Sequence, residues 1–289
     1  MTELETPILP EQKWRETIRA ADDGFTIGFR ELLEYRDLLL ILVKRDISSI
    51  YKQTVLGPTW FFLQPIFTTL VYFVIFSRIA KFELDMPPAL FYLGGIIMWN
   101  YFADCLLKIS SALKDNSQIF SKVYFPRLII PLSIGITNLV KLSIQLVLFA
   151  LVFLYYFLTT NQLHPGPWIL FFPLLILVMA LLALGCGLIV ASLTIRYKDL
   201  SHLLTFSVQL VMFVSAVFFP LDKMDEGVYK KIIQFNPMSG LIETFRYLFS
   251  GKGSFHINLL GYDVLCALLV LFAGLFIFKK TEKDFVDTI

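Results

Sequence analysis

Long apolar stretches alternate with short polar ones along the chain. No Asp, Glu, Lys or Arg occurs in residues 53–77, 86–103 or 142–195. The last stretch is long enough for two helices, and the turn signal TTNQLHPGP at residues 159–167 divides it. A membrane-spanning helix needs about 20 mostly apolar residues. The pattern therefore predicts six spans, at about 57–78, 87–108, 130–158, 168–194, 200–220 and 257–278.

The composition agrees with this pattern. Of the 289 residues, 57% are hydrophobic and 17% are charged, and the mean hydropathy is +0.71, which is too apolar for a soluble globular domain. We therefore expect an all-α integral membrane protein. A net charge of +2 gives no reason to expect nucleic acid as a partner. The three cysteines lie in apolar stretches and are expected to be small core residues: Cys105, Cys186 and Cys266.

The placement of Lys and Arg predicts the orientation in the membrane. If the N-terminus lies in the cytosol, 17 of the 25 Lys and Arg residues fall on the inner side of the six predicted spans. The positive-inside rule therefore favours a multi-pass protein with both termini in the cytosol. Residues 1–28 lack the basic and then apolar order of a signal peptide, so we expect them to form a cytosolic segment. Residues 281–289 are expected to form a cytosolic tail.

Residues 29–54 are expected to form an amphipathic helix along the cytosolic membrane surface. At about 100° per residue, charged and polar positions fall on one side and apolar positions on the other. The polar side contains Arg30, Glu31, Glu34, Asp37, Lys44, Arg45, Ser48, Ser49 and Lys52, and the apolar side contains Phe29, Leu32, Leu33, Tyr35, Leu39, Leu40, Val43, Ile47, Ile50 and Tyr51. Four residues do not fit: Arg36, Leu38, Ile41 and Asp46. Gly57 then breaks the helix, and Pro58 suits the first turn of a spanning helix.

The sequence contains no recognisable catalytic constellation. Its histidines, His164, His202 and His256, are distant in sequence from one another and from acidic clusters. We therefore expect them at turns or interfaces rather than at a metal. The nearest approach to a nucleotide-binding loop, at residues 251–254, lacks the first glycine of that motif and the Ser or Thr that should follow Lys252. We expect neither ATP hydrolysis nor a cofactor in this chain.

Three segments carry a family resemblance. They are RELLEYRDLLLILVKRDISSIYKQTVLGPTW (30–60), SKVYFPRLIIPLS (121–133) and NPMSGLIETFRYLFSG (236–251). They resemble the permease subunits of type-2 ATP-binding-cassette (ABC) exporters, in the polysaccharide and O-antigen (lipopolysaccharide transport) branch. The resemblance covers almost the whole chain and implies a permease domain at residues 29–280. It also implies a homodimer, two separate ATPase subunits that bind ATP and Mg²⁺, and passage of a lipid-linked polysaccharide across the bacterial inner membrane.

The polar segment 109–126 joins the second and third predicted spans on the cytosolic side. The resemblance assigns to it the coupling helix that contacts the ATPase, and the candidate coupling residues here are Lys114, Asp115, Lys122 and Tyr124. Arg45 and Lys52 of the amphipathic helix are further candidates. A solvated loop without a partner is the alternative interpretation.

Residues 221–256 lie outside the membrane in the predicted topology, and GVYKKIIQF and PMSGLIETFRYLFSG are each too short and too charged to span it. Asn236 and Pro237 predict an N-cap followed by a first-turn proline. The resemblance implies two short re-entrant helices that form an exit gate, with Asn236, Pro237 and Arg246 as candidates. Helices that rest on the outer surface are the alternative.

Lys141 is the one charge expected near mid-membrane. It lies 14 residues beyond Arg127, which is about 21 Å along a helix. A charge there costs roughly 2.5–3.5 kcal/mol on insertion scales, so it should face the protein interior or water. A snorkelling lysine is the alternative. Asp104 is only four residues from Lys108, and on this count it is expected at a shallower depth and as a poor partner for Lys141.

Aromatic residues gather near the ends of the first two predicted spans. They are Trp60, Tyr92, Trp99, Tyr101 and Phe102. With Lys141 they are the candidates for a substrate conduit, since aromatic faces pack on sugar C–H groups and their O–H or N–H groups bond to hydroxyls. The alternative is interfacial anchoring, because Trp and Tyr favour headgroup depth.

The main hypothesis is therefore a permease that moves lipid-linked polysaccharide and whose conformation is set by separate ATPase subunits. Alternatives within the superfamily are an exporter of capsule or teichoic-acid polymer, or of a drug or small lipid. A membrane glycosyl- or acyltransferase would need paired carboxylates or a His and acid motif at one membrane face. An ion-coupled transporter would need several ionisable residues at mid-depth, where this chain offers Lys141 almost alone.

Overall fold

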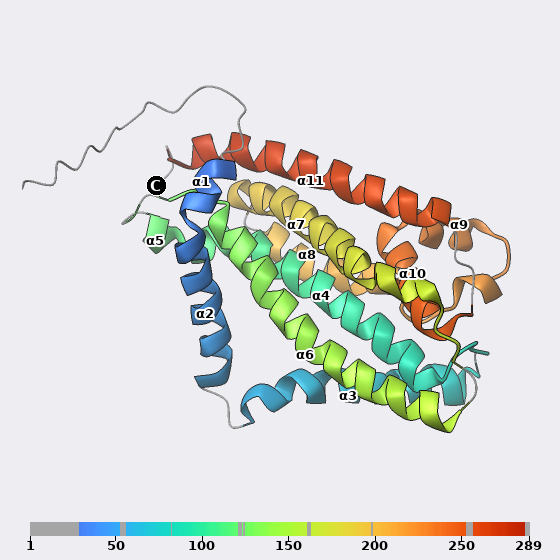
Figure 1. Cartoon of the computed structure of the whole chain (residues 1–289). Helices are drawn as coiled ribbons and strands as arrows, with labels where there is room; N and C mark the ends of the chain where they lie inside the picture. Colours follow the sequence, from blue (N-terminus) through green and yellow to red (C-terminus); the bar gives the residue numbers. More distant parts are fainter. Residues whose placement is uncertain are drawn as a thin grey trace, which may run out of the picture.

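The computed structural model describes residues 29–52, 56–81, 83–120, 123, 125–160, 163–197, 199–252 and 257–286. Within these ranges every regular element is a helix (Figure 1). The elements are α1 (Phe29–Glu34), α2 (Arg36–Lys52), η1 (Gly57–Thr59), α3 (Trp60–Tyr72), η2 (Phe73–Ile79), α4 (Pro88–Asp115), α5 (Ser117–Phe120), α6 (Ile129–Thr159), η3 (Pro167–Phe171), α7 (Phe172–Arg196), α8 (Leu200–Phe213), η4 (Leu221–Lys223), α9 (Val228–Phe235), α10 (Pro237–Ser250) and α11 (Ile257–Val286).

Five helical segments among the described residues are long and apolar enough to cross a membrane. They are Trp60–Ile79, Pro88–Asp115, Ile129–Thr159, Pro167–Ile195 and Asn258–Glu282. The expected all-α membrane fold is thereby confirmed, as is the turn that divides the apolar stretch 142–195.

The predicted span at 200–220 is shorter than expected. Its helix, α8, has 14 residues and ends at Phe213. At 1.5 Å per residue it is about 21 Å long, whereas the hydrocarbon core is about 30 Å thick. The residues up to Pro220 follow in turns and bends, and Ala216 has a positive φ of 49°. The count of six spans therefore stays a prediction.

The core of the bundle is formed around α4. Most of its spanning part is buried, and it packs against α6 on one side and α7 on the other, while α11 packs along α7 (Figure 1). The α7–α11 contact is very close: a Cβ added at Gly274 would lie 2.5 Å from the carbonyl oxygen of Gly185. Glycine is therefore required where these two backbones cross.

The long helices of the bundle lie side by side along one common axis, and short elements lie at the two ends of the bundle (Figure 1). At one end lie α1, α5 and the C-terminal turns of α11, and at the other end lie α9 and α10. Following the predicted topology, we call the first the inner end and the second the outer end.

The amphipathic segment is helical, but as two helices rather than one, because α1 and α2 are separated at Tyr35. α2 packs against α6 and buries Leu42 and Val43. Leu38, which did not fit the predicted wheel, packs with Leu42, whereas Leu40, from the predicted apolar side, is exposed. The apolar residues thus form two stripes, one that packs on the bundle and one that faces away from it. A helical wheel drawn with one apolar face does not distinguish these two stripes. The break at Gly57 is confirmed by its positive φ of 52°.

Candidate functional site

Two short helices, α9 and α10, lie where the sequence predicted them, and α10 begins with the predicted cap; their re-entry into the membrane stays a prediction. The Asn236 side-chain oxygen accepts a hydrogen bond from the backbone N–H of Met238 at 3.0 Å, and Pro237 is the first residue of the helix. The Asn236 amide nitrogen donates to the carbonyl of Val214 at 3.0 Å and to the hydroxyl of Ser215 at 2.8 Å. Asn236 therefore joins the start of α10 to the residues that follow α8.

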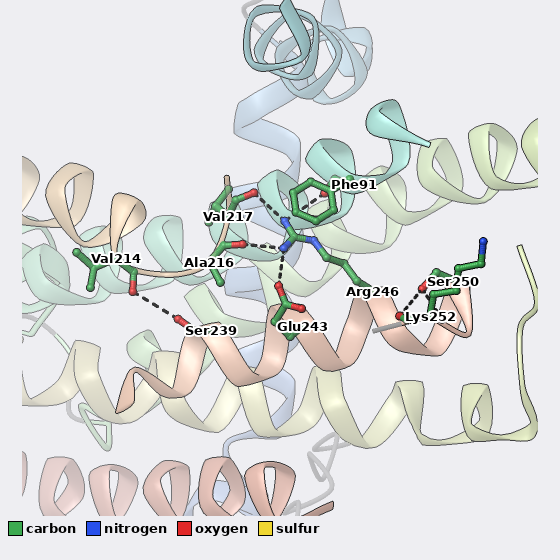
Figure 2. Close-up of polar contacts among 9 residues, drawn as sticks. All are labelled: Phe91, Val214, Ala216, Val217, Ser239, Glu243, Arg246, Ser250 and Lys252. Carbon is green, nitrogen blue, oxygen red and sulfur yellow. Dashed lines mark hydrogen bonds and ion pairs between the residues drawn. The ribbon is translucent and has the colours of Figure 1, made fainter. Parts of the chain in front are cut away.

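Arg246, on α10, makes four hydrogen bonds through its two terminal nitrogens, whereas its buried Nε has no hydrogen-bond partner among the described residues. It is 4% exposed. One terminal nitrogen donates to the carbonyl of Ala216 at 2.7 Å and to Glu243 at 3.0 Å. The other donates to the carbonyls of Val217, at 2.7 Å, and Phe91, at 3.3 Å (Figure 2). We call Arg246, Glu243, Phe91 and residues 214–217 the outer clamp.

The outer clamp joins three elements that are far apart in the sequence. Figure 2 shows the Arg246 side chain pointing from α10 towards the carbonyls of Ala216 and Val217 and towards Phe91 at the start of α4. The guanidinium carbon lies 3.5 Å from the centre of the Phe91 ring, in cation–π contact. A Cβ added at Gly95 would lie 2.7 Å from the Arg246 guanidinium, so only glycine leaves room for it on α4.

The electrostatics of the clamp follow from burial. Burial lowers the pKa of Arg246, and the neighbouring Glu243 carboxylate opposes that shift. Burial raises the pKa of Glu243, and Arg246 opposes that shift in turn. The Arg246 charge is therefore stabilised by Glu243 and by the backbone carbonyls, and the Glu243 charge by Arg246 and by a backbone hydrogen bond from Leu221, as expected for a buried pair. The clamp fixes α10 against α4 and the end of α8, at the place where the exit gate is predicted. The gate role itself stays a prediction.

Lys141 is paired with Asp104, so the expectation that Asp104 is a poor partner is wrong. The Lys141 ammonium donates to the Asp104 carboxylate at 2.5 Å. α4 and α6 are antiparallel neighbours, and one step towards the inner end the Lys108 ammonium donates to the side chain of Asn138 at 3.3 Å. Moving outward from that contact brings both Asp104 and Lys141 to the same depth. The interpretation of Lys141 as a snorkelling lysine, which depends on its depth in the membrane, stays a prediction.

Polar contacts continue along α6 towards α3. The Lys141 ammonium lies 5.9 Å from the centre of the Phe61 ring, and the Gln145 amide donates to the Phe61 carbonyl at 3.5 Å. The side chains of Lys141 and Asp104 are 16% and 31% exposed, so the pair is only partly enclosed by the chain. A polar line of Asn138, Lys141 and Gln145 therefore follows one side of a membrane-spanning helix.

The five aromatic candidates do not share one surface of the chain. Trp60, at the start of α3, is 49% exposed. Four others lie on α4 and are buried: Tyr92, Trp99, Tyr101 and Phe102. Trp99 and Phe102 are in contact, with ring centres 5.6 Å apart. The side chains on α4 would reach a polymer only if neighbouring helices moved apart, and their conduit role stays a prediction.

The inner end presents the described coupling candidates to solvent. Lys114 and Asp115, at the end of α4, are exposed, as are Arg45 and Lys52 on α2. Lys122 and Tyr124 lie outside the described residues. We call the apolar cluster behind this surface the inner corner, which is formed by Leu42, Ala112, Phe125, Ile129 and Ile130. It joins α2 to the segment between α4 and α6.

Three contacts were not predicted from the sequence. They are the bond of Arg246 to Glu243, the pair of Lys141 with Asp104, and a contact of Arg127 with the end of α11. The i,i+3 spacing of Glu243 and Arg246 on one helix was a usable signal for the first. Within the described ranges, no three His, Cys, Asp or Glu side chains lie close enough together to hold a metal ion.

The sequence similarity to known proteins extends over most of the chain. Residues 37–250 match the family model described as ABC-2 type transporter. The chain is 27% identical over 265 residues to the O-antigen export system permease protein RfbA of Myxococcus xanthus, with 90% of this chain and 98% of the relative covered. It is 24% identical over 253 residues to the RfbA protein of Klebsiella pneumoniae, covering 87% and 94%. It is 25% identical over 254 residues to the polysialic acid transport protein KpsM of Escherichia coli, covering 84% and 92%. Since the family match extends over more than half of its residues, the chain belongs to the ABC-2 type transporter family.

Proposed function

We propose that the chain is the membrane-spanning permease subunit of an ATP-driven exporter that moves lipid-linked, O-antigen-like polysaccharide across the inner membrane. The observation that carries this proposal is the end-to-end similarity to a protein named as an O-antigen export permease, which covers 98% of that relative. The long apolar helices support a membrane path for the substrate. The distribution of Lys and Arg supports a cytosolic location for both termini.

The working complex would contain a second copy of this chain and two ABC ATPase subunits, which would bind the ATP and Mg²⁺. The exposed residues of the inner end, Lys114, Asp115, Arg45 and Lys52, would contact the ATPase, and movement there would be transmitted through α4. α4 extends from the inner end, at Asp115, to Phe91 in the outer clamp. A rigid element that reaches both ends supports coupling between ATP hydrolysis and the predicted exit gate.

Export of capsule polysaccharide is the second candidate function. It is favoured by the match to KpsM and by a match of 23% identity over 267 residues to the capsule polysaccharide export inner-membrane protein CtrC of Neisseria meningitidis. Both candidates share a lipid-linked polymer as cargo, so the fold does not separate them. Export of a drug or small lipid has no such relative in its favour.

Deletion of the gene in its native host tests the proposal. We expect surface polysaccharide to fall and lipid-linked polysaccharide to accumulate on the cytosolic side, with both effects reversed by the wild-type gene. The chemical composition of the accumulated glycan would assign it to O-antigen or to capsule. Normal surface glycan together with normal levels of the lipid-linked precursor in the deletion strain would reject both.

A further inference from the structure

Arg127 lies where three segments of the inner end meet. It precedes α6, and its terminal nitrogen donates to the backbone carbonyl of Glu282 on α11 at 2.9 Å. Its Nε lies 3.9 Å from the Glu282 carboxylate. On its other side, the guanidinium lies 5.7 Å from the centre of the Phe120 ring, at the end of α5. Arg127 thus touches the end of α5, the start of α6 and the last turns of α11.

The Phe120 side chain is part of the apolar packing at the inner end. Its ring stacks on Phe125 with centres 5.3 Å apart, and it packs against the inner corner together with residues of α2. The position of Phe120 therefore determines how α5 lies on the bundle. Lys114 and Asp115, at the end of α4, and Val123 are exposed, so this region is accessible to a partner protein.

The contact of Arg127 with α11 differs from an ordinary surface ion pair. The Arg127 side chain is 14% exposed, and it donates a hydrogen bond to a main-chain carbonyl near the end of a helix. The negative end of the helix dipole favours a cation at this place, and the bond to the carbonyl does not depend on the Glu282 side chain. A partly buried bond of this kind is more strongly oriented than an exposed pair.

Most of the packing of α11 in the bundle is made away from this contact. Among the described elements, α11 packs broadly only against α7 and α10, and the close crossing of Gly185 and Gly274 lies in that packing. α11 nevertheless continues as a helix to Val286, past the predicted end of the span at residue 278. Arg127 contacts α11 at Glu282, the last residue of the apolar segment Asn258–Glu282, one turn before the helix ends.

We propose that Arg127 is a positioning residue: by bonding to the last turns of α11 and packing on Phe120, it holds the α5 segment, which follows α4, in the orientation that the ATPase subunit binds. This inference rests on the proposed function, since it assumes an ATPase partner at the inner end. It assigns to the C-terminal turns of α11 a role in coupling that their sequence does not suggest. Loss of the bond leaves the segment in several orientations, so the competent one is populated for only a fraction of the time.

The test uses the full-length permease in lipid nanodiscs, titrated with the ATPase subunit that co-purifies with it from the native host. For Arg127→Gln we expect the ATPase concentration at half-maximal binding to be about ten-fold higher than for wild type. Maximal binding should be unchanged, because only the fraction of permease in the competent orientation changes. The midpoint for Arg127→Lys should lie between those of the wild type and Arg127→Gln. Glu282→Gln should shift the midpoint less than about two-fold, since the carbonyl bond remains. The matched control is Lys280→Gln, an exposed charge on the same turns of α11, and it should titrate as wild type.

The outcomes separate this inference from the proposed function. If no ATPase co-purifies with the wild-type permease or binds to it, the proposed function fails. If wild type binds and Arg127→Gln has the same midpoint, the positioning role is overturned. A purely structural role is indicated, and the inference is again overturned, if Arg127→Gln lowers the amount of folded permease while the folded fraction binds with the wild-type midpoint.

Discussion

Replacing Arg246 by methionine perturbs the outer clamp at its centre. Methionine retains much of the apolar volume but none of the donors, so Glu243 and the carbonyls of Ala216 and Val217 lose the bonds that the guanidinium supplies. Breaking a buried ion pair from one side costs about 3–5 kcal/mol, because the remaining charge stays buried. A buried carbonyl without a donor adds about 1–3 kcal/mol. Some relaxation of the turn after α8 is expected, so we predict a loss of at least about 4 kcal/mol.

This loss is a large part of the stability of a typical domain, which is about 5–15 kcal/mol. The second variant, Glu243→Gln combined with Arg246→Met, removes the uncompensated charge and should recover at least about 1 kcal/mol relative to Arg246→Met alone. Arg246→Lys keeps the charge but not the forked geometry, so its stability should lie between those of wild type and Arg246→Met.

The assay is unfolding of the purified permease in mixed micelles with increasing amounts of SDS, followed by circular dichroism and tryptophan fluorescence. Lys231→Met on α9 is the matched control, because this exposed lysine lies on the neighbouring helix, and it should change the stability by less than about 0.5 kcal/mol. The reasoning about the clamp is refuted if Arg246→Met costs less than about 1 kcal/mol. It is equally refuted if the double variant is no more stable than the single one.

Three further predictions concern the rest of the chain. A double-mutant cycle on Lys141→Met and Asp104→Asn should give a coupling of about 0.5–3 kcal/mol in the same unfolding assay, and additive effects would show that the pair is not formed. If Trp99 lines the conduit, Trp99→Ala should reduce surface glycan at an unchanged level of the permease. If Trp99 is an anchor, surface glycan should fall only in proportion to the permease level, and Trp99→Phe should restore both. A single cysteine at Asp225 should react with an impermeant thiol reagent from outside and one at Asp115 only after permeabilisation; external labelling at Asp115 would contradict the topology.

The long helices could be predicted because each apolar run is a property of contiguous residues. The end of α8 could not be predicted in this way. The residues after Phe213 remain apolar as far as Pro220, and composition gives no signal that the helix stops. It stops where Ala216 adopts a positive φ and its carbonyl bonds to Arg246, which lies 30 residues further along the chain. A tertiary contact thus overrides an apolar pattern.

Charged pairs between helices were the harder part of the site. Lys141 was expected to face the protein interior or water because of its predicted depth. Its partner depends on the register of α4 against α6, and Asp104 and Lys141 are 37 residues apart in the sequence. Counting residues from the nearest charge on each helix placed Asp104 at the wrong depth. The contact of Arg127 with the carbonyl of Glu282 was also inaccessible, because a backbone acceptor has no signature in the sequence.

ATP-driven movement of glycan in a defined system tests the central claim most directly. The purified permease and its ATPase would be reconstituted in vesicles with the ATPase outside, lipid-linked polysaccharide from the deletion strain would be added, and the fraction protected from an external glycosidase would be followed. We predict that ATP increases this protected fraction, and that vesicles with a hydrolysis-deficient ATPase or without permease show no increase. A protected fraction that stays the same with and without ATP, in vesicles whose ATPase is active and bound to the permease, would contradict the account.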